Sequence, residues 1–428
     1  MEEKTYPLYR THWVSRRWFH YAIIFFFTSL ISTILPAFIL WGGGFWFYLD
    51  SVRVNTTLGV FISCIAAGAS IIRFMCHPGV DALYNIIKKV LIIYSLLLAF
   101  LVFTRLEYSR AIIIMSFVFF SLSCFVIFWI SAKYCKAIYG IIPVGSFNKL
   151  KEVDTINWVV LNNPASFLDS LHCDGVVVDF KALESHDTWQ RFLAGCTLLK
   201  IPVYHSKQVY ESLTGRVSIE HLHENDFGTT LAPLPFSCFK RLFDVTVILI
   251  LLPFIFPVIF LTSIFIVVES SGPIFFVQKR VGCDNKDFFI YKFRSMYCDS
   301  ELNGMQFAKV QDYRVTRVGR FIRKYRIDEL PQFLNVIKGD MSLIGPRPEQ
   351  RFFVEKFESE LPFYIYRHMI RPGISGWAQV MHGYSGDVES TRTKLEYDFY
   401  YIKNFSFWLD LLILFKTVRT VFTGFGAR

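Results

Sequence analysis

Cysteine patterns that bind zinc or form disulfide frameworks are missing from this chain of 428 residues. Its nine cysteines stand singly, with no CxxC pair and no histidine at the spacing of a metal ligand. Both classes are therefore disfavoured, and the cysteines are expected to be reduced. A nucleic-acid-binding motif is also missing, so the net charge of +10 is assigned to an anionic membrane face or anionic substrates, with no nucleic acid as partner.

Central charges are missing from four long apolar runs in a chain that is 53% hydrophobic and 18% aromatic. A bilayer-spanning helix needs roughly 20 apolar residues. The runs are Phe19 to Trp41, Thr56 to Ile72, Val90 to Thr104 and Ala111 to Ser131. They predict a membrane protein with four transmembrane helices, although one run could instead be a buried core helix. The first run is too long for a cleaved signal peptide and has no small-residue cleavage site, so we expect it to be retained.

Basic residues predict how these spans are oriented. They gather before the first span (Lys4, Arg10, Arg16, Arg17), between the second and third (Arg73, Lys88, Lys89) and after the fourth (Lys133, Lys136). Cytoplasmic loops carry an excess of such residues, so the amino terminus is predicted to lie in the cytoplasm. Arg105 and Arg110 flank an outer loop, so the pattern is imperfect.

Glycine is scarce in the next segment, residues 137–235, at the place where a dinucleotide site would need it. Short β-branched runs begin at Ile141, Trp158, Gly175 and Ile201 and predict a cytoplasmic, Rossmann-like α/β domain with parallel strands. The first run leads into VGSFNK, which has one glycine instead of the three of the dinucleotide fingerprint. A scaffold or regulatory role is favoured over a working cofactor site.

A fifth uncharged run, Val245 to Val268, is 24 residues long. Lys240 and Arg241 precede it, and Lys279 and Arg280 follow, so the positive-inside rule assigns both flanks to the cytoplasm. Pro253 and Pro257 lie within it, and each removes a backbone donor and bends a helix. We expect a re-entrant helix over about 242–269, with a plain kinked span as the alternative.

Two adjacent acids, Asp328 and Glu329, precede Pro331 in RIDELPQFLNVIKGD. Proline suits a first helical position and Gly339 suits the residue after the last turn, so both acids are expected at a helix entrance. Basic residues surround them in the sequence: Arg317, Arg320, Arg323, Lys324, Arg326, Lys338 and Arg347. A carboxylate pair, a Mg²⁺ ion and several cations indicate a phosphoryl-transfer site, whereas the alternative is a capping acid in a solvated salt-bridge network.

The carboxyl-terminal part closely resembles the bacterial sugar transferase domain of monotopic phosphoglycosyl transferases. The likeness runs from about Phe239 to the end and rests on FDVTVILILLPFIFP, GPIFFVQKRVG, YKFRSM, DELPQFLNVIKGDMSLIGPRP, RPGISGWAQV and EYDFYYIKNFSFWLDLLIL. The preceding spans and α/β segment resemble the larger members, the undecaprenyl-phosphate galactose or glucose phosphotransferases. Three domains are thus expected: 1–136 transmembrane, 137–235 α/β, and 236–428 a mainly helical catalytic domain.

The resemblance implies an enzyme that transfers a sugar 1-phosphate from a UDP-sugar to undecaprenyl phosphate and releases UMP. Such enzymes start O-antigen, capsule or exopolysaccharide synthesis; galactose is expected first and glucose second. Asp328 corresponds to the family's nucleophile, which forms an aspartyl phosphosugar. Mg²⁺ is implied at the pair, with Glu329 a metal ligand or a helper of the second step. Single-step transfer with Asp328 only holding metal is the alternative.

Eight further residues take substrate roles from the same motifs. Contacts to phosphate are suggested for Lys292, Arg294, Arg347 and Arg371. A place at the nucleotide pocket is suggested for Gln278, Arg280 and Gln379, together with Trp377. Ordinary interfacial salt bridges, lipid contacts and core packing are the alternatives.

The resemblance also implies a place in the cell, the bacterial inner membrane, with the catalytic domain on its cytoplasmic face. Phe352 to Ile370 and Phe405 to Phe422 are aromatic but interrupted by charges, which suits interfacial amphipathic helices or core packing. A homodimer is expected from the resemblance and from the frequency of twofold oligomers. Phe256 stands before Pro257 where the family commonly has serine, so either Pro253 shares the bend or another residue supplies a hydrogen-bond partner.

Overall fold

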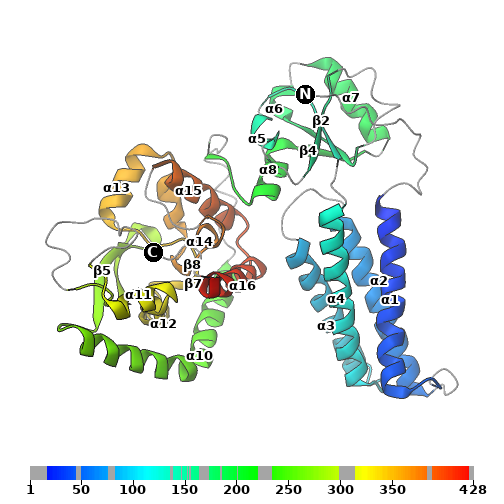
Figure 1. Ribbon diagram of the computed structural model, residues 1–428. Coiled ribbons are helices and arrows are strands. Elements are labelled where there is room, and N and C mark those ends of the chain that lie inside the picture. The colour runs from blue at the N-terminus through cyan, green and yellow to red at the C-terminus, as the bar shows by residue number, and fades with distance from the viewer. Residues whose placement is uncertain are drawn as a thin grey trace. The chain divides into compact units, whose positions relative to one another are not determined.

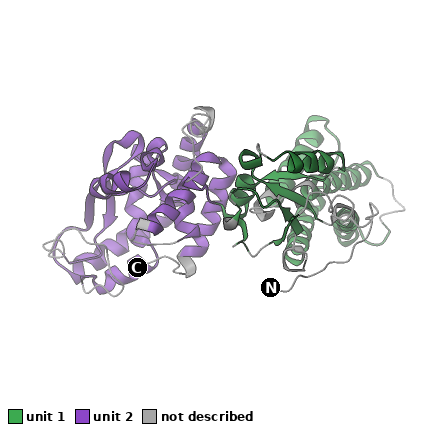
Figure 2. Cartoon of the chain, turned by 90° about the horizontal axis from the view of Figure 1, so that it is seen from above, with its two compact units in different colours: residues 1–215 green, residues 216–428 purple. Residues whose placement is uncertain are grey.

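Helices predominate in the computed structural model of the protein, which also contains a small parallel sheet (Figure 1). The structure describes residues 17–44, 50–75, 82–134, 138–145, 147–151, 153, 156–162, 173–183, 186–199, 201–219, 234–297, 314–382 and 388–423. Contacts divide the chain into two compact units, residues 1–215 and 216–428 (Figure 2). The predicted boundary at 136/137 lies outside the described residues, as do Lys4, Arg10, Arg16 and Lys136.

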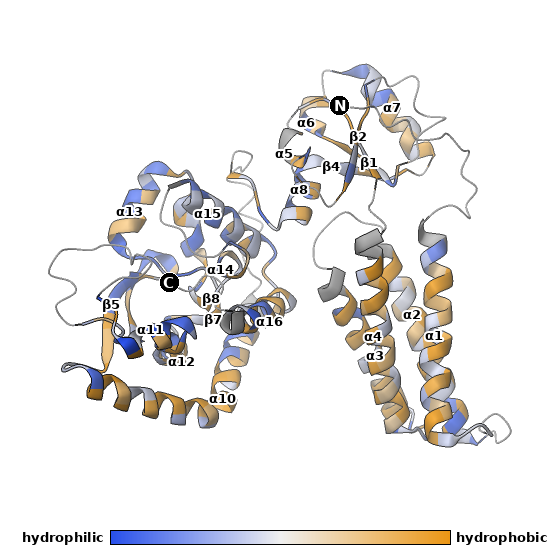
Figure 3. Cartoon of the chain, in the orientation of Figure 1, coloured by the Kyte–Doolittle hydropathy of each residue, from blue (hydrophilic) through white to orange (hydrophobic). Residues whose placement is uncertain are grey.

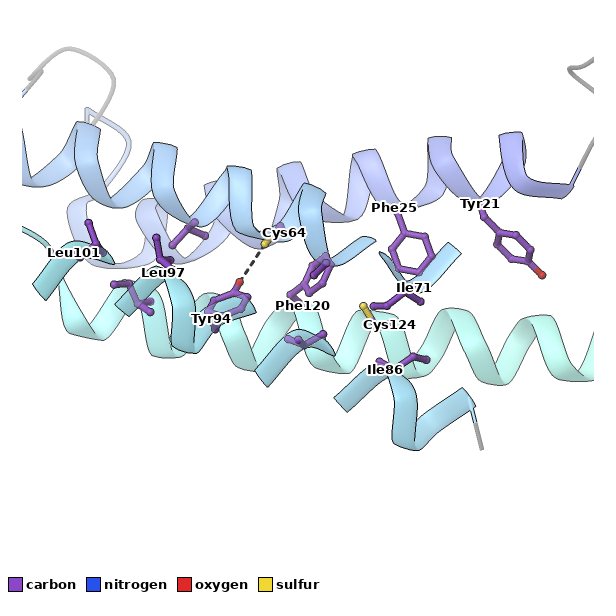
Figure 4. Packing of buried hydrophobic residues seen from close by; sticks show 14 residues of the cluster. Tyr21, Phe25, Cys64, Ile71, Ile86, Tyr94, Leu97, Leu101, Phe120 and Cys124 are labelled. Carbon is purple, nitrogen blue, oxygen red and sulfur yellow. Dashed lines mark hydrogen bonds between the residues drawn. The ribbon is translucent and has the colours of Figure 1, made fainter. Parts of the chain in front are cut away.

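Four long apolar helices begin the first unit and pack against one another. They are α1 (Arg17–Trp41), α2 (Ser51–Met75), α3 (Ala82–Phe103) and α4 (Arg110–Tyr134). Each coincides with one predicted span, and α2 and α3 begin before their predicted apolar runs, at Ser51 and Ala82. Cys64, Tyr94 and Phe120 lie in the shared core, where the Cys64 thiol and the Tyr94 hydroxyl are 3.1 Å apart (Figure 4).

The outer faces of these helices are also apolar. Phe27, Leu96, Ile114 and Trp129 are each more than half exposed, which is expensive in water and favourable in lipid. Helices α1 to α4 and helix α10 (Leu234–Glu269) are the five described helices that are long and apolar enough to cross a membrane (Figure 3). This surface is that of a membrane protein.

The rest of the first unit is the predicted α/β segment. Its strands are β1 (Ile138–Ile141), β2 (Asn157–Val160), β3 (Gly175–Val178) and β4 (Val203–His205), and they form a sheet in the order β2-β1-β3-β4. All three strand pairs are parallel, which confirms that prediction. The first strand ends at Ile141, where the sequence suggests a beginning, because Pro143 has no N–H to donate.

Helices pack on both faces of this sheet. The short α5 (Asn148–Lys151) and α6 (Phe180–Leu183) accompany α7 (Asp187–Leu198) and α8 (Ser206–Thr214). Val176 and Val178 share a core with Trp189 of α7, whereas Val177 shares one with Val209 of α8. Successive strand residues therefore face opposite layers, as in a sheet buried on both sides.

The second unit combines short strands with many helices. Its strands are β5 (Phe275–Val281) and β6 (Asp287–Phe293), which form an antiparallel hairpin, and β7 (Ser342–Ile344) and β8 (Gly373–Ser375), which pair in parallel. Its helices after α10 are α11 (Arg317–Lys324), α12 (Phe333–Lys338), α13 (Arg351–Glu360), α14 (Trp377–Met381), α15 (Val388–Lys403) and α16 (Phe407–Thr423), with 3₁₀ segments η3 (Cys283–Asn285), η5 (Ile327–Gln332) and η6 (Tyr364–Met369). Residues 216–219 already belong to this unit, and the Val217 amide donates to the Glu396 carbonyl at 3.1 Å.

The longest helix, α10, is anchored at both ends to the second unit. Near its start, Lys240 pairs with Asp410 of α16 at 2.6 Å, and Arg241 donates to carbonyls at the end of α12. At its other end, the Glu269 carboxylate accepts from the first amides of α11 at 2.7 and 3.0 Å. A straight helix of its 36 residues would be about 54 Å long.

Between its two anchored ends, α10 changes direction (Figure 1). Pro253 and Pro257 lie in this stretch and explain the bend, because each removes a backbone donor. Phe254 and Phe256 here are 74% and 62% exposed, so the bend presents bare aromatic surface.

Candidate active site

Asp328 and Glu329 lie in η5, the 3₁₀ segment that leads directly into α12. The turn before it places Arg326 in the left-handed region, with φ of 56°. Pro331 lies inside η5, so the expectation that it opens the α-helix is wrong: the α-helix begins two residues later, at Phe333. Gly339 ends α12 with φ of 100°, as predicted.

The electrostatic support for this pair comes from side chains. The segments η5 and α12 have six residues each, too few for a large macrodipole. Three cations instead surround the Glu329 carboxylate. Arg347 Nη2 and Lys292 Nζ donate to Oε1 at 2.8 and 3.2 Å, and Arg326 Nη1 lies 3.6 Å from Oε2.

Glu329 is buried, with 6% of its surface exposed, so its charge depends on these partners. Burial alone would raise the pKa of Glu329, but Arg347, Lys292 and Arg326 outweigh burial and hold that pKa well below its usual range. Burial also lowers the pKa of Lys292, against the pull of Glu329. The cluster therefore favours the ionised form of Glu329 and gathers positive charge around it.

Asp328 differs from its neighbour in its contacts. Its half-buried carboxylate forms no hydrogen bond or ion pair with any residue that the structure describes. Burial, reinforced by the charge of Glu329, raises the pKa of Asp328 to about 6, although Lys292, Arg323 and Arg347 act against this. A carboxylate that is ionised at neutral pH, unengaged and close to several cations is suited to nucleophilic attack on a phosphoryl group.

A buried asparagine connects the strand that carries Lys292 with the helix that follows the two acids. Asn335 of α12 is fully buried; its Oδ1 accepts from the Tyr291 amide at 3.1 Å and its Nδ2 donates to the Phe289 carbonyl at 2.6 Å. These bonds fasten β6 to α12. Lys292, which follows Tyr291, is thereby held against Glu329.

The donors at the pair fit Mg²⁺ in part. No group of three or more His, Cys, Asp or Glu side chains that could hold a metal occurs among the described residues. Mg²⁺ is commonly held by one or two carboxylates and substrate phosphates, so the free carboxylate of Asp328 fits this ion. Both oxygens of Glu329 already face cations, so Glu329 fits as a ligand only if it gives up one of them.

Gln278 and Arg280 of β5 border the loop that carries Arg347. Arg280 Nε donates to Gln278 Oε1 at 3.0 Å, and its Nη1 donates to the Pro348 carbonyl at 3.1 Å and lies 3.4 Å from Glu349. These contacts bring both residues next to the loop that carries Arg347, for which a phosphate contact is predicted. Their role toward a nucleotide stays a prediction.

Arg294 has a different set of contacts. Its guanidinium donates to the carbonyl oxygens of Ser270 and Ser271, at 2.5 and 2.9 Å, and thereby caps the end of α10. These bonds give the buried Arg294 side chain a role in the fold that requires no substrate. Contact with a substrate phosphate stays a prediction for this residue.

Arg371 and Gln379 lie on other elements of the unit. Arg371 is exposed and lines a cavity of about 240 Å³. Other parts of that cavity's wall come from Lys240, Asp244, Ser342, Ile370 and Phe405. Gln379 Nε2 donates to the Ile374 carbonyl at 3.4 Å, whereas its buried Oε1 has no hydrogen-bond partner within the described residues. Trp377 is buried against Tyr400, as a core residue is.

Four residues that sequence motifs assign to the site thus meet there: Asp328, Glu329, Lys292 and Arg347. Arg326, one of the basic residues around the pair and without a predicted substrate role, is a third partner of Glu329. Its spacing of three residues from Glu329 is consistent with this pairing.

Replacing Glu329 with an uncharged residue tests whether the stability of the cluster depends on its carboxylate. Glu329→Gln leaves Lys292 and Arg347 without their counter-ion, so we expect the free energy of unfolding to fall by about 3 kcal/mol. Chemical unfolding of the protein in detergent micelles measures the change. Asp287→Asn is the matched control, since Asp287 also pairs with two cations but is more exposed, and should cost about 1 kcal/mol or less. Equal losses in the two variants would contradict the prediction.

Comparison with known proteins identifies the family of this chain. Residues 236–424 match the family model described as bacterial sugar transferase. A protein of Aeromonas hydrophila named UDP-N-acetylgalactosamine-undecaprenyl-phosphate N-acetylgalactosaminephosphotransferase is 49% identical over 424 residues, 99% of this chain and 100% of the relative.

Other relatives match the carboxyl-terminal part. The UDP-glucose:undecaprenyl-phosphate glucose-1-phosphate transferase of Klebsiella pneumoniae is 37% identical over 240 residues, 54% of this chain and 49% of that protein. A putative undecaprenyl-phosphate N-acetylgalactosaminyl 1-phosphate transferase of Bacillus subtilis is 46% identical over 150 residues, 35% of this chain and 83% of that protein. Because the first relative is matched along its whole length, the chain belongs to the bacterial sugar transferase family, as one of its large membrane-bound members.

Proposed function

We propose that this enzyme transfers a sugar 1-phosphate from a UDP-sugar to undecaprenyl phosphate and releases UMP. The names of its relatives support both substrates. The observation that carries the proposal is the unengaged carboxylate of Asp328 beside the cations gathered by Glu329. Cations arranged in this way attract the diphosphate of a nucleotide sugar and stabilise the charge that develops during phosphoryl transfer.

The proposed reaction has two steps. A carboxylate oxygen of Asp328 forms a bond to the β-phosphorus of the UDP-sugar, while the bond from that phosphorus to the bridging oxygen breaks and UMP leaves with that oxygen. A phosphate oxygen of undecaprenyl phosphate then attacks the same phosphorus, and the carboxylate leaves. Lys292 and Arg347 remain beside the reacting phosphate in both steps, because Glu329 holds them there.

Mg²⁺ is proposed as the cofactor, held by Asp328 together with substrate phosphates. When bound, it supplies further positive charge to the phosphate oxygens. Glu329 supports this arrangement by orienting the cations around it, which is also compatible with the helper role that the family resemblance implies.

The sugar is proposed to be N-acetylgalactosamine, because that sugar appears in the name of the relative matched along its whole length. Galactose, which the sequence resemblance places first, and glucose, which the Klebsiella relative's name carries, follow as candidates. Covalent chemistry at Asp328 does not depend on which of the three is transferred.

The enzyme is proposed to work at the cytoplasmic face of the bacterial inner membrane. Helix α10 is anchored at both ends to one folded unit and exposes apolar residues at its bend, which supports a re-entrant helix. α1 to α4 are proposed to span the bilayer, and α13 and α16, which carry exposed Phe352 and Phe415, to lie at its surface. The homodimer stays a prediction from the family.

Release of UMP tests the reaction. The purified protein with undecaprenyl phosphate and Mg²⁺ should release UMP from UDP-N-acetylgalactosamine faster than from UDP-galactose or UDP-glucose. Asp328→Asn should lower the rate at least about 10³-fold, because the covalent route is lost. Asp287→Asn, an equivalent change on the exposed hairpin, should keep the rate within about twofold. Full turnover by Asp328→Asn would end the assignment of the nucleophile.

Labelling of cysteines tests the course of α10. Cys238 is exposed at its first turns, and Pro273→Cys places a thiol just past its end, in a chain whose other cysteines are replaced. A membrane-impermeant maleimide should label both only after the cells are lysed. Leu106→Cys, in the turn between α3 and α4, is the control and should react in intact cells. Labelling of one α10 flank alone in intact cells would contradict the re-entrant course.

A further inference from the structure

Arg347 stands on a short loop between β7 and α13 whose backbone is fastened residue by residue. The Gly345 amide donates to the Ser375 carbonyl at 2.8 Å, and the Pro346 carbonyl accepts from the Gly373 amide at 2.9 Å. Side chains secure the next two carbonyl groups. Arg367 Nη2 donates to the Arg347 carbonyl at 2.9 Å, and Arg280 Nη1 donates to that of Pro348 at 3.1 Å.

Arg367 is itself fixed by its surroundings. Only 7% of its surface is exposed, and its Nη2 also lies 2.9 Å from Asp398 Oδ2 on α15. Its Nη1 donates to the Tyr364 hydroxyl at 2.6 Å. Because a guanidinium is planar, these partners fix the direction in which its fork points at the Arg347 carbonyl.

The hydrogen bond from Arg367 to the Arg347 carbonyl connects α15 with the cluster of charges at Glu329. Asp398 holds Arg367, Arg367 holds the backbone of Arg347, and the Arg347 side chain meets Glu329 Oε1 at 2.8 Å. Arg347 has a long side chain that is 30% exposed, so its direction depends on where its backbone is held. A displacement of the order of 1 Å at a substrate-orienting group can cost about 10²-fold in rate.

We propose that Arg367, oriented by Asp398 and Tyr364, is a positioning residue that holds Arg347 against Glu329 and beside Asp328. The inference rests on the proposed function, in which Arg347 contacts the transferred phosphate. Arg367 acts through Arg347 alone and touches no substrate. Its contribution should therefore disappear when the Arg347 side chain is removed.

A double-mutant cycle tests this dependence. Arg367→Lys keeps the charge opposite Asp398 but loses the fork, and should lower kcat for UMP release roughly 10-fold to 100-fold. In an Arg347→Ala background, the same change should alter the rate less than about twofold, since the two sites then no longer couple. Equal losses in the two backgrounds would overturn the proposal.

Two further variants separate positioning from loss of folding. If Arg367→Lys does not fold, Tyr364→Phe takes its place in the double-mutant cycle. Tyr364→Phe removes only one partner of Arg367, so we expect a smaller effect on kcat. Arg351→Lys is the matched control. The Arg351 guanidinium also binds a carboxylate and a carbonyl, those of Asp287 at 2.7 Å and Asn285 at 2.8 Å, and both of these partners belong to the β5–β6 hairpin. Its kcat should stay within about twofold of the unmutated enzyme.

Binding of UDP distinguishes failure of this inference from failure of the proposed function. The same cycle is measured by calorimetry with UDP as the ligand, and the two changes should again be non-additive. A protein that binds UDP but releases no UMP from any UDP-sugar would refute the proposed reaction, while non-additive binding would still support the positioning role. Additive effects on UDP affinity in an enzyme that does release UMP would refute the positioning role alone.

Discussion

A buried carboxylate is costly unless cations surround it, and the arrangement of the second unit follows from meeting this cost at Glu329. Three separate parts of the chain supply the cations: β6 carries Lys292, the turn before η5 carries Arg326, and the loop after β7 carries Arg347. The same positive charge that keeps Glu329 ionised is then available to a phosphate group. The carboxylate of Asp328, one residue away, forms no hydrogen bond or ion pair with the described residues, and we propose it as the nucleophile.

The membrane imposes the second constraint, because a nucleotide sugar dissolves in water and a polyprenol chain does not. An enzyme that joins them has to hold its reacting groups where the two phases meet. The second unit combines both requirements in one fold: the polar cluster at η5, and a helix, α10, whose bend around Pro253 and Pro257 exposes aromatic side chains. The contacts of Lys240 and Glu269 at its two ends fix this helix to the domain that carries the site.

Sequence patterns predicted the large features because those features depend on composition and on local chemistry. Uncharged apolar runs located all five long helices, and Gly339 marked the end of α12 through its left-handed backbone. The start of α12 was missed, since proline fits a 3₁₀ turn as well as a first helical position. The Arg294 contacts at α10 and the link from Asp398 through Arg367 join residues far apart in the chain, and no local pattern contains such information.

The central claim is that Asp328 becomes covalently loaded with a sugar phosphate. The most direct measurement is the mass of the peptide that contains Asp328 after the enzyme has been mixed with a UDP-sugar, in the absence of undecaprenyl phosphate, and quenched in acid. We expect an added sugar phosphate on this peptide, and we expect it to disappear when undecaprenyl phosphate is supplied. An unmodified peptide from an enzyme that turns over in the complete reaction would contradict it, and would favour transfer in a single step.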